Sequence, residues 1–103
     1  IDIFVLSSRW EGFGFVLAEA MAAAKPIVAF NISSNPELVL HQKNGLLVEA
    51  FNLDEFTLAV EKLINNPSLR TDYGLYGYHY VYQYFTFEKS IELFFNYLLN
   101  LRS

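Results

Sequence analysis

The stretch FVLAEAMAAAKPIVAF, from Phe15 to Phe30, decides the fold, because it holds a helix followed directly by a strand. Phe15–Lys25 is rich in alanine, leucine and methionine, which favour helices. Pro26 cannot continue that helix, and the apolar residues of Pro26–Phe30 predict the next strand. The preceding apolar run, Ile1–Ser8, predicts a strand buried on both faces. A strand, a helix and a strand in this order form a βαβ unit with a right-handed crossover.

The rest of the chain predicts one further strand and several helices. Asn35 is expected to cap a short helix that Pro36 begins, and Lys43–Gly45 marks a turn. The remaining elements are expected within Asn31–Val39 (short helix), Leu46–Ala50 (strand), and Asp54–Asn65, Leu69–Phe85 and Phe87 or Glu88 to about Leu101 (helices). This order predicts an α/β fold: a Rossmann-like open parallel sheet with helices on both faces and extra helices at the C-terminus.

Composition narrows the class of protein. The 103 residues suffice for one small domain, and 53% of them are hydrophobic while 17% are charged. This is more apolar than a free-standing domain of that size needs, so we expect surface that faces a missing domain, a partner or a membrane. The net charge of −4, without basic blocks, argues against nucleic-acid binding.

The location expected from the sequence is cytoplasmic. The chain has no cysteine, which excludes disulfides and thiolate metal sites and agrees with a reducing compartment. No apolar run reaches the roughly 18–20 residues of a membrane span. Peripheral binding at the inner face of the membrane is left open. The chain starts in what reads as mid-strand, so we expect a piece of a longer protein.

The candidate site lies in RWEGFGFVLAEAMA, between the first strand and the first helix. A parallel sheet binds ligands at the carboxyl ends of its strands, where this loop is expected. Gly12 and Gly14 allow a tight turn and a close approach of a ligand to the backbone. The first turn of the helix offers unpaired N–H groups that suit a phosphate. Glu19, one to two turns into the helix, can accept hydrogen bonds from the hydroxyls of a ribose, and Glu11 would lie nearer the far side of the diphosphate.

Several motifs in the same order resemble the group-1 glycosyltransferases with the GT-B fold, the retaining GT4 family. The two glutamates, Glu11 and Glu19, are separated by seven residues as in that family. The resemblance is carried by Ser8–Gly14, Glu19–Ala22, Lys25–Ala29, Pro36–Val39 and Asn44–Val48, and so covers nearly the whole chain. It departs from the family at Ser33-Ser34-Asn35 and at Ala24, where glycines are usual.

The resemblance implies a role for each matching residue. Glu19 would bind the ribose of the nucleotide. Glu11 is the expected catalytic residue, because it would contact hydroxyls of the donor sugar and hold it near the reacting centre. The backbone amides of Phe13, Gly14, Phe15 and Val16, next to Gly12, would cradle the diphosphate and the donor sugar. No metal and no cofactor are expected, and catalysis would rest on binding and electrostatic stabilisation of the leaving diphosphate.

The resemblance thus implies that residues 1–103 form the second half of a nucleotide-sugar-binding domain. The parent enzyme would transfer a hexose from a UDP-, GDP- or ADP-sugar to an acceptor hydroxyl with retention, in polysaccharide or glycolipid biosynthesis. The acceptor, a sugar or lipid-linked glycan, would bind a missing N-terminal domain. The basic residues against the diphosphate would also lie upstream, so the isolated chain is expected to be inactive. Two alternatives stay open: a nucleotide-sugar epimerase of the same fold, and a non-catalytic nucleotide-binding or interaction module.

Two groups outside the motif receive no catalytic role. His41 and His79 are widely separated and lack metal-ligand spacing. The tyrosines form a helical stripe at positions 73, 76, 80 and 84, extended to another face by Tyr78 and Tyr82. Such a stripe is typical of packing against a sheet or helix, with an inter-domain surface as the alternative.

Overall fold

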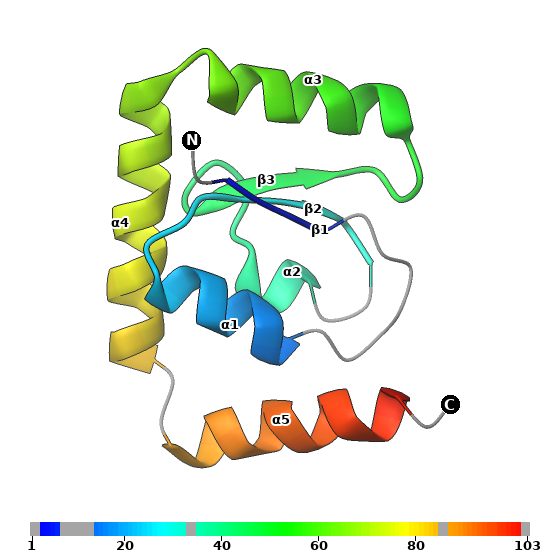
Figure 1. The fold of residues 1–103 in the computed structure, drawn as a ribbon, viewed down its shortest axis with the longest axis vertical. Helices are drawn as coiled ribbons and strands as arrows, with labels where there is room; N and C mark the ends of the chain where they lie inside the picture. The colour runs from blue at the N-terminus through cyan, green and yellow to red at the C-terminus, as the bar shows by residue number, and fades with distance from the viewer. Residues whose placement is uncertain (1–2, 7–13, 33–34, 85–86, 102–103) are drawn as a thin grey trace.

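A parallel three-stranded sheet lies at the centre of the molecule, with helices on both of its faces (Figure 1). The computed structural model describes residues 3–6, 14–32, 35–84 and 87–101. The strands are β1 (Phe4–Leu6), β2 (Ile27–Phe30) and β3 (Gly45–Val48), in the order β1-β2-β3. The helices are α1 (Gly14–Ala22), α2 (Asn35–Leu38), α3 (Leu53–Ile64), α4 (Pro67–Tyr84) and α5 (Phe87–Leu101). The predicted α/β fold with an open parallel sheet is confirmed.

The central strand β2 supplies both hydrophobic cores. All four of its residues are buried, and successive side chains point to opposite faces of the sheet. Ile27 and Ala29 join the core under α1 and α2, whereas Val28 and Phe30 join the core under α3. Both faces of β2 are therefore removed from water, which explains why its sequence is apolar without alternation.

The first strand differs from its prediction. β1 spans Phe4–Leu6, and its middle residue, Val5, is 48% exposed instead of buried. The register pairs Val5 with Val28, so both side chains lie on the face that α3 covers. α3 packs against β2 and β3, and its cover does not extend over Val5. The expected strand therefore forms, but it is not buried on both faces.

Helix α1 ends three residues before the predicted end at Lys25. The amide of Lys25 donates to the carbonyl of Ala20, and the amide of Ala24 donates to the carbonyl of Met21. Ala24 has a φ of 57°, in the left-handed region. These features form a Schellman motif, in which the residue after the helix adopts the conformation that glycine prefers. The sequence has alanine there, and the turn forms at a cost in backbone strain.

Helix α4 crosses the amino ends of the strands, at the left in Figure 1. It closely approaches α1 and the turn that follows α1, where two of its glycines, Gly74 and Gly77, are buried. A Cβ atom at Gly74 would overlap the carbonyl oxygen of Ala24. A Cβ atom at Gly77 would lie at ordinary contact distance, 3.4 Å from Asn44 Cβ and 3.5 Å from Met21 Cγ. Gly74 is therefore required by packing, although glycine weakens a helix interior.

Asparagines precede α3 and α4, which begin one and two residues before the predicted starts at Asp54 and Leu69. Asn52 caps α3, where its side-chain oxygen accepts a hydrogen bond of 3.0 Å from the amide of Glu55. Asn66 Oδ1 accepts a 3.3 Å bond from the amide of Leu69 at the start of α4. Arg70 in turn donates to the last carbonyls of α3, those of Leu63 and Ile64, at 2.7 Å each. These contacts fix the corner between α3 and α4.

The tyrosines of the predicted stripe differ in burial: some pack on a core and others are exposed. Tyr73 is buried in the core under α3, and this burial raises its pKa above the usual value of 10.0. Tyr80 packs against the other core, whereas Tyr76 is 40% and Tyr82 67% exposed. Packing explains two of the predicted tyrosines, and the exposed ones face away from both cores. The side chain of Tyr84 lies outside the described part.

Candidate functional site

The candidate site lies at the carboxyl edge of the sheet, where β1 and β2 end and α1 begins (Figure 1). Since the strands are parallel, their carboxyl ends meet at one edge, opposite the edge that α4 crosses. The first residues of α1, from Gly14, face this edge. A helix start in that position presents backbone N–H groups and the positive end of the helix dipole. The predicted phosphate-binding turn before Gly14 lies outside the described residues, so phosphate binding at this place stays a prediction.

The predicted site residues are only partly described. Gly14, Phe15 and Val16 form the beginning of α1, and the side chain of Val16 is half-buried. Glu11, Gly12 and Phe13 lie outside the described residues, so the expected juxtaposition of Glu11 with Glu19 stays a prediction.

Glu19 lies on the exposed face of α1. Its neighbours Leu17 and Met21 are fully buried, and Ala20 is 5% exposed, all on the face that packs on the sheet and α4. The helix therefore points a carboxylate toward solvent, five residues after its first residue, Gly14 (19 − 14 = 5). An exposed carboxylate keeps free lone pairs with which it can accept hydrogen bonds from ligand hydroxyls.

The rim after β2 is shaped by a buried asparagine. Asn35 is 4% exposed, and its side-chain Nδ2 donates a 2.9 Å hydrogen bond to the carbonyl of Phe30, the last residue of β2. The sequence predicts Asn35 as the cap before the short helix, but it is the first residue of α2. Its amide donates to the carbonyl of Ile32 at 3.0 Å. Asn35 therefore closes the turn at the carboxyl edge of β2 in place of the usual glycines.

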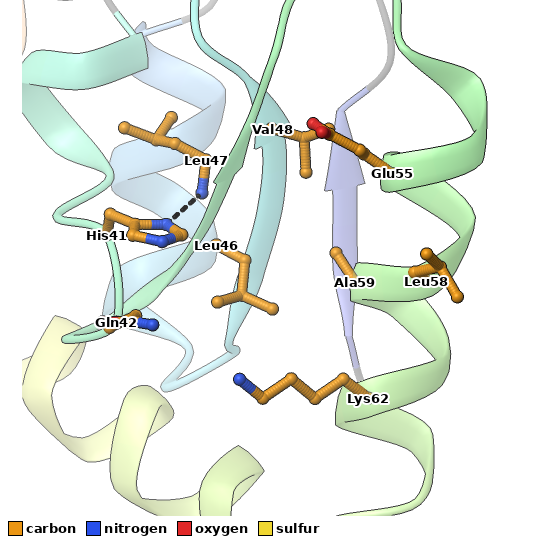
Figure 2. Close-up of a pocket in the computed structure, with 9 residues that line it drawn as sticks. All are labelled: His41, Gln42, Leu46, Leu47, Val48, Glu55, Leu58, Ala59 and Lys62. Carbon is orange, nitrogen blue, oxygen red and sulfur yellow. Dashed lines mark hydrogen bonds between the residues drawn. The ribbon is translucent and has the colours of Figure 1, made fainter.

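A shallow pocket of about 270 Å³ lies elsewhere, between β3 and α3 (Figure 2). Its lining consists of His41, Gln42, Leu46, Leu47, Val48, Glu55, Leu58, Ala59 and Lys62. None of the predicted donor-binding residues lines it. The Nδ1 atom of His41 accepts a 3.0 Å hydrogen bond from the amide of Leu47. No pattern in the sequence signals this contact, because it joins two residues across a turn.

Two kinds of feature are absent from the part of the chain that the structure describes. There, no three histidine, aspartate or glutamate residues gather in a way that could hold a metal ion. In the same residues, no helix combines the length and the apolar character needed to cross a bilayer.

Solved structures share this fold. The sucrose-phosphate synthase of Thermosynechococcus elongatus superposes with a TM-score of 0.79 and 26% identity, over 99% of this chain and 26% of that one. The C-terminal domain of a glycosyl transferase group 1 family protein from Francisella tularensis superposes with a TM-score of 0.76 and 31% identity, over 84% of this chain and 45% of that one. The fold is thus that of the GT-B glycosyltransferases.

The sequence matches the family "Glycosyl transferases group 1" over residues 1–80, and the chain belongs to this family. An uncharacterised glycosyltransferase of Haemophilus influenzae is 47% identical over 69 residues, which make up 66% of this chain and 20% of that protein. One from Methanocaldococcus jannaschii is 38% identical over 90 residues, 87% of this chain and 25% of that protein. The poly(ribitol-phosphate) alpha-N-acetylglucosaminyltransferase of Staphylococcus aureus is 30% identical over 95 residues, 91% of this chain and 19% of that protein.

The chain therefore spans about a fifth to a quarter of the length of these curated relatives. The family expected from the sequence motifs is confirmed. Members of this family are glycosyltransferases, so the expected class of enzyme, a transferase, is supported.

Proposed function

We propose that residues 1–103 form part of the donor-binding domain of a retaining glycosyltransferase. The whole protein would move a hexose from a UDP-, GDP- or ADP-sugar to the hydroxyl of an acceptor. One observation carries this proposal: the start of α1 faces the carboxyl edge of a parallel sheet, with the exposed Glu19 further along the same helix. That arrangement suits a diphosphate at the helix start and a ribose beside the carboxylate.

Each part of the donor would be bound by a different group of this chain. The amides at the start of α1, together with the turn that contains Gly12 and Phe13, would stabilise the diphosphate as it leaves the sugar. Glu11 would hold the donor sugar through its hydroxyls, and Glu19 would accept hydrogen bonds from the ribose. Retention and the choice of a hexose rest on the family resemblance. The name of the Staphylococcus aureus relative supports a hexosamine-type sugar as one member of the donor class.

The proposal needs parts that these residues do not contain. The acceptor domain, and the basic groups that would contact the diphosphate, would belong to the rest of the protein. This fits the observation that the chain covers only 20% and 25% of two of its relatives. The chain by itself would then be inactive, and sugar transfer by residues 1–103 alone would contradict that part of the proposal.

The role of Glu19 is tested by calorimetric titration of the full-length protein with UDP, GDP and ADP. Replacement Glu19→Ala is expected to weaken binding of the preferred nucleotide about 10- to 100-fold, because hydrogen bonds to a charged acceptor are lost. The same replacement should leave binding of the matching 2′,3′-dideoxynucleotide unchanged, since that ligand lacks the hydroxyls. The matched control Glu61→Ala removes an exposed carboxylate from α3 and should change neither affinity.

Equal losses for the nucleotide and its dideoxy form would show that Glu19 acts through the fold and not on the ribose. Product analysis on the full-length protein separates transfer from the alternative chemistry, because an epimerase changes the configuration of the sugar without loading an acceptor.

A further inference from the structure

The outer edge of β3 is closed by its own preceding turn. β3 is last in the sheet order of the described residues, so one of its edges pairs with β2 and the other points away. On the outer edge, the carbonyl of Gly45 accepts a 2.8 Å hydrogen bond from the amide of Gln42. The amide of Leu47 donates to Nδ1 of His41 at 3.0 Å (Figure 2). Backbone groups on a strand edge otherwise invite pairing with another strand.

The turn that carries His41 is held in place by the hydrogen bonds of a buried side chain. Asn44 is fully buried, and its Oδ1 accepts a 2.6 Å hydrogen bond from the amide of Leu40. Its Nδ2 donates to the carbonyl of Leu38 at 2.9 Å. Gln42 completes the turn in the left-handed region, with a φ of 63°. The backbone of His41 is therefore held beside β3, while its imidazole stays exposed to solvent.

The hydrogen bond to Leu47 exists in only one protonation state of His41. A backbone N–H can only donate, so Nδ1 must be without a proton and the neutral ring must carry its proton on Nε2. Protonation puts a hydrogen on Nδ1 and turns the contact into a meeting of two donors. Histidine is the side chain that ordinarily changes charge between about pH 5 and 8.

Charged groups of both signs lie in the same pocket or the same turn as His41. Glu55 and Lys62 of α3 line the same pocket as His41, and Lys43 lies in the same turn.

We propose that the imidazole of His41 is a pH-dependent cover, here called the latch, on the outer edge of β3. At neutral pH the imidazole covers the Leu47 amide and keeps the outer edge of β3 closed. When the pH falls and Nδ1 takes up a proton, the latch opens and the Leu47 amide becomes available to water or to another strand. The contribution of this hydrogen bond is therefore present at higher pH and lost as the pH falls. The latch is independent of the proposed sugar transfer.

Amide hydrogen exchange followed by NMR tests the latch in the protein between about pH 7.5 and 5. The protection of the Leu47 amide, corrected for the intrinsic exchange rate, should fall roughly three- to tenfold relative to the Val28 amide of β2. His41→Asn places an amide oxygen near the position of Nδ1 and should keep Leu47 protected at every pH. The control His79→Asn changes an exposed histidine of α4 and should leave the pH dependence as in the wild type.

Constant Leu47 protection through the titration of the His41 ring would overturn the proposal, as would an unchanged pH dependence in His41→Asn. A further measurement needs no variant: the ring nitrogen chemical shifts at neutral pH should show the proton of His41 on Nε2. A proton on Nδ1 would overturn the proposal even if the substituted proteins did not fold.

Discussion

Ala24 holds a backbone conformation that its side chain disfavours. Its φ of 57° is required by the Schellman turn that leads from α1 into β2. Left-handed geometry costs an L-residue about 1–2 kcal/mol, because Cβ crowds the backbone. The family resemblance marks this position as one where glycine is usual, and the turn supplies the physical reason.

Replacement Ala24→Gly is expected to raise the free energy of unfolding by about 1 kcal/mol, since relief of strain outweighs the added freedom of the unfolded chain. Urea denaturation of the wild type and the variant measures this change. Ala23→Gly is the matched control: that residue lies next to Ala24 and is not in the left-handed region, so it should give no gain. A gain of the same size at Ala23 would argue against strain at Ala24.

Single residues also show how far the sequence alone can go at the site. The exposure of Glu19 follows from helical periodicity. Leu17, Ala20 and Met21 recur at the spacing of one buried helix face, and Glu19 falls outside that face. The hydrogen bond of His41 is not visible in any pattern, because it depends on a turn that the buried Asn44 closes. The sequence predicts Asn35 as a helix cap, but its bond to the carbonyl of Phe30 depends on how β2 and α2 lie in the assembled fold.

At the level of elements, the contact between α4 and the turn that follows α1 depends on one glycine. Gly74 lies where a Cβ atom would overlap the carbonyl oxygen of Ala24, whereas Gly77 leaves room for one. Replacement Gly74→Ala should therefore lower the free energy of unfolding by about 1–3 kcal/mol, despite the better helix propensity of alanine. Gly77→Ala should be neutral or stabilising by up to about 1 kcal/mol.

Denaturant midpoints of the two variants measure this difference. The pair is matched, because both replacements add one methyl group to a buried glycine of the same helix. Equal effects of the two replacements would mean that helix propensity, and not contact with the turn after α1, decides the stability of the variants.

The elements themselves could be predicted because each has a local cause. Pro26 marks the end of one element and the start of the next without help from distant parts of the chain. The structure adds that Asn52 and Asn66 cap α3 and α4 through bonds to residues three positions on, which are local causes too. The ends that tertiary contacts decide were missed. α1 stops at Ala22 because the chain must turn back into β2, although Ala23 to Lys25 are good helix formers. Likewise, the exposure of Val5 depends on how far α3 reaches over the sheet.

Across the whole molecule, burial is uneven. β2 is covered on both faces, while α5 packs against α1 and exposes several large apolar side chains. These are Ile91, Phe94, Phe95, Leu98 and Leu99. The apolar excess anticipated from the composition is thus concentrated in part on this helix.

Hydrogen exchange of the native protein should follow this gradient. Amides of β2 are expected to exchange only through global unfolding, and amides of α5 on the order of 100-fold faster through local opening. Helix α4 serves as the control, because it is also a helix but packs closely on α1, and its amides should fall between the two. Uniform amide protection across β2, α4 and α5 would contradict the expected gradient of local stability.

The double role of β2 also limits how this gene can change over time. Ile27 and Ala29 belong to one core and Val28 and Phe30 to the other, so losing or gaining one codon inside the strand would turn the side chains after the change to the opposite faces. Phe30 would then be forced toward α1, and both halves of the interior would be spoiled by one event. Length changes among descendants of this sequence should therefore accumulate in the segments around β2 and spare the strand itself.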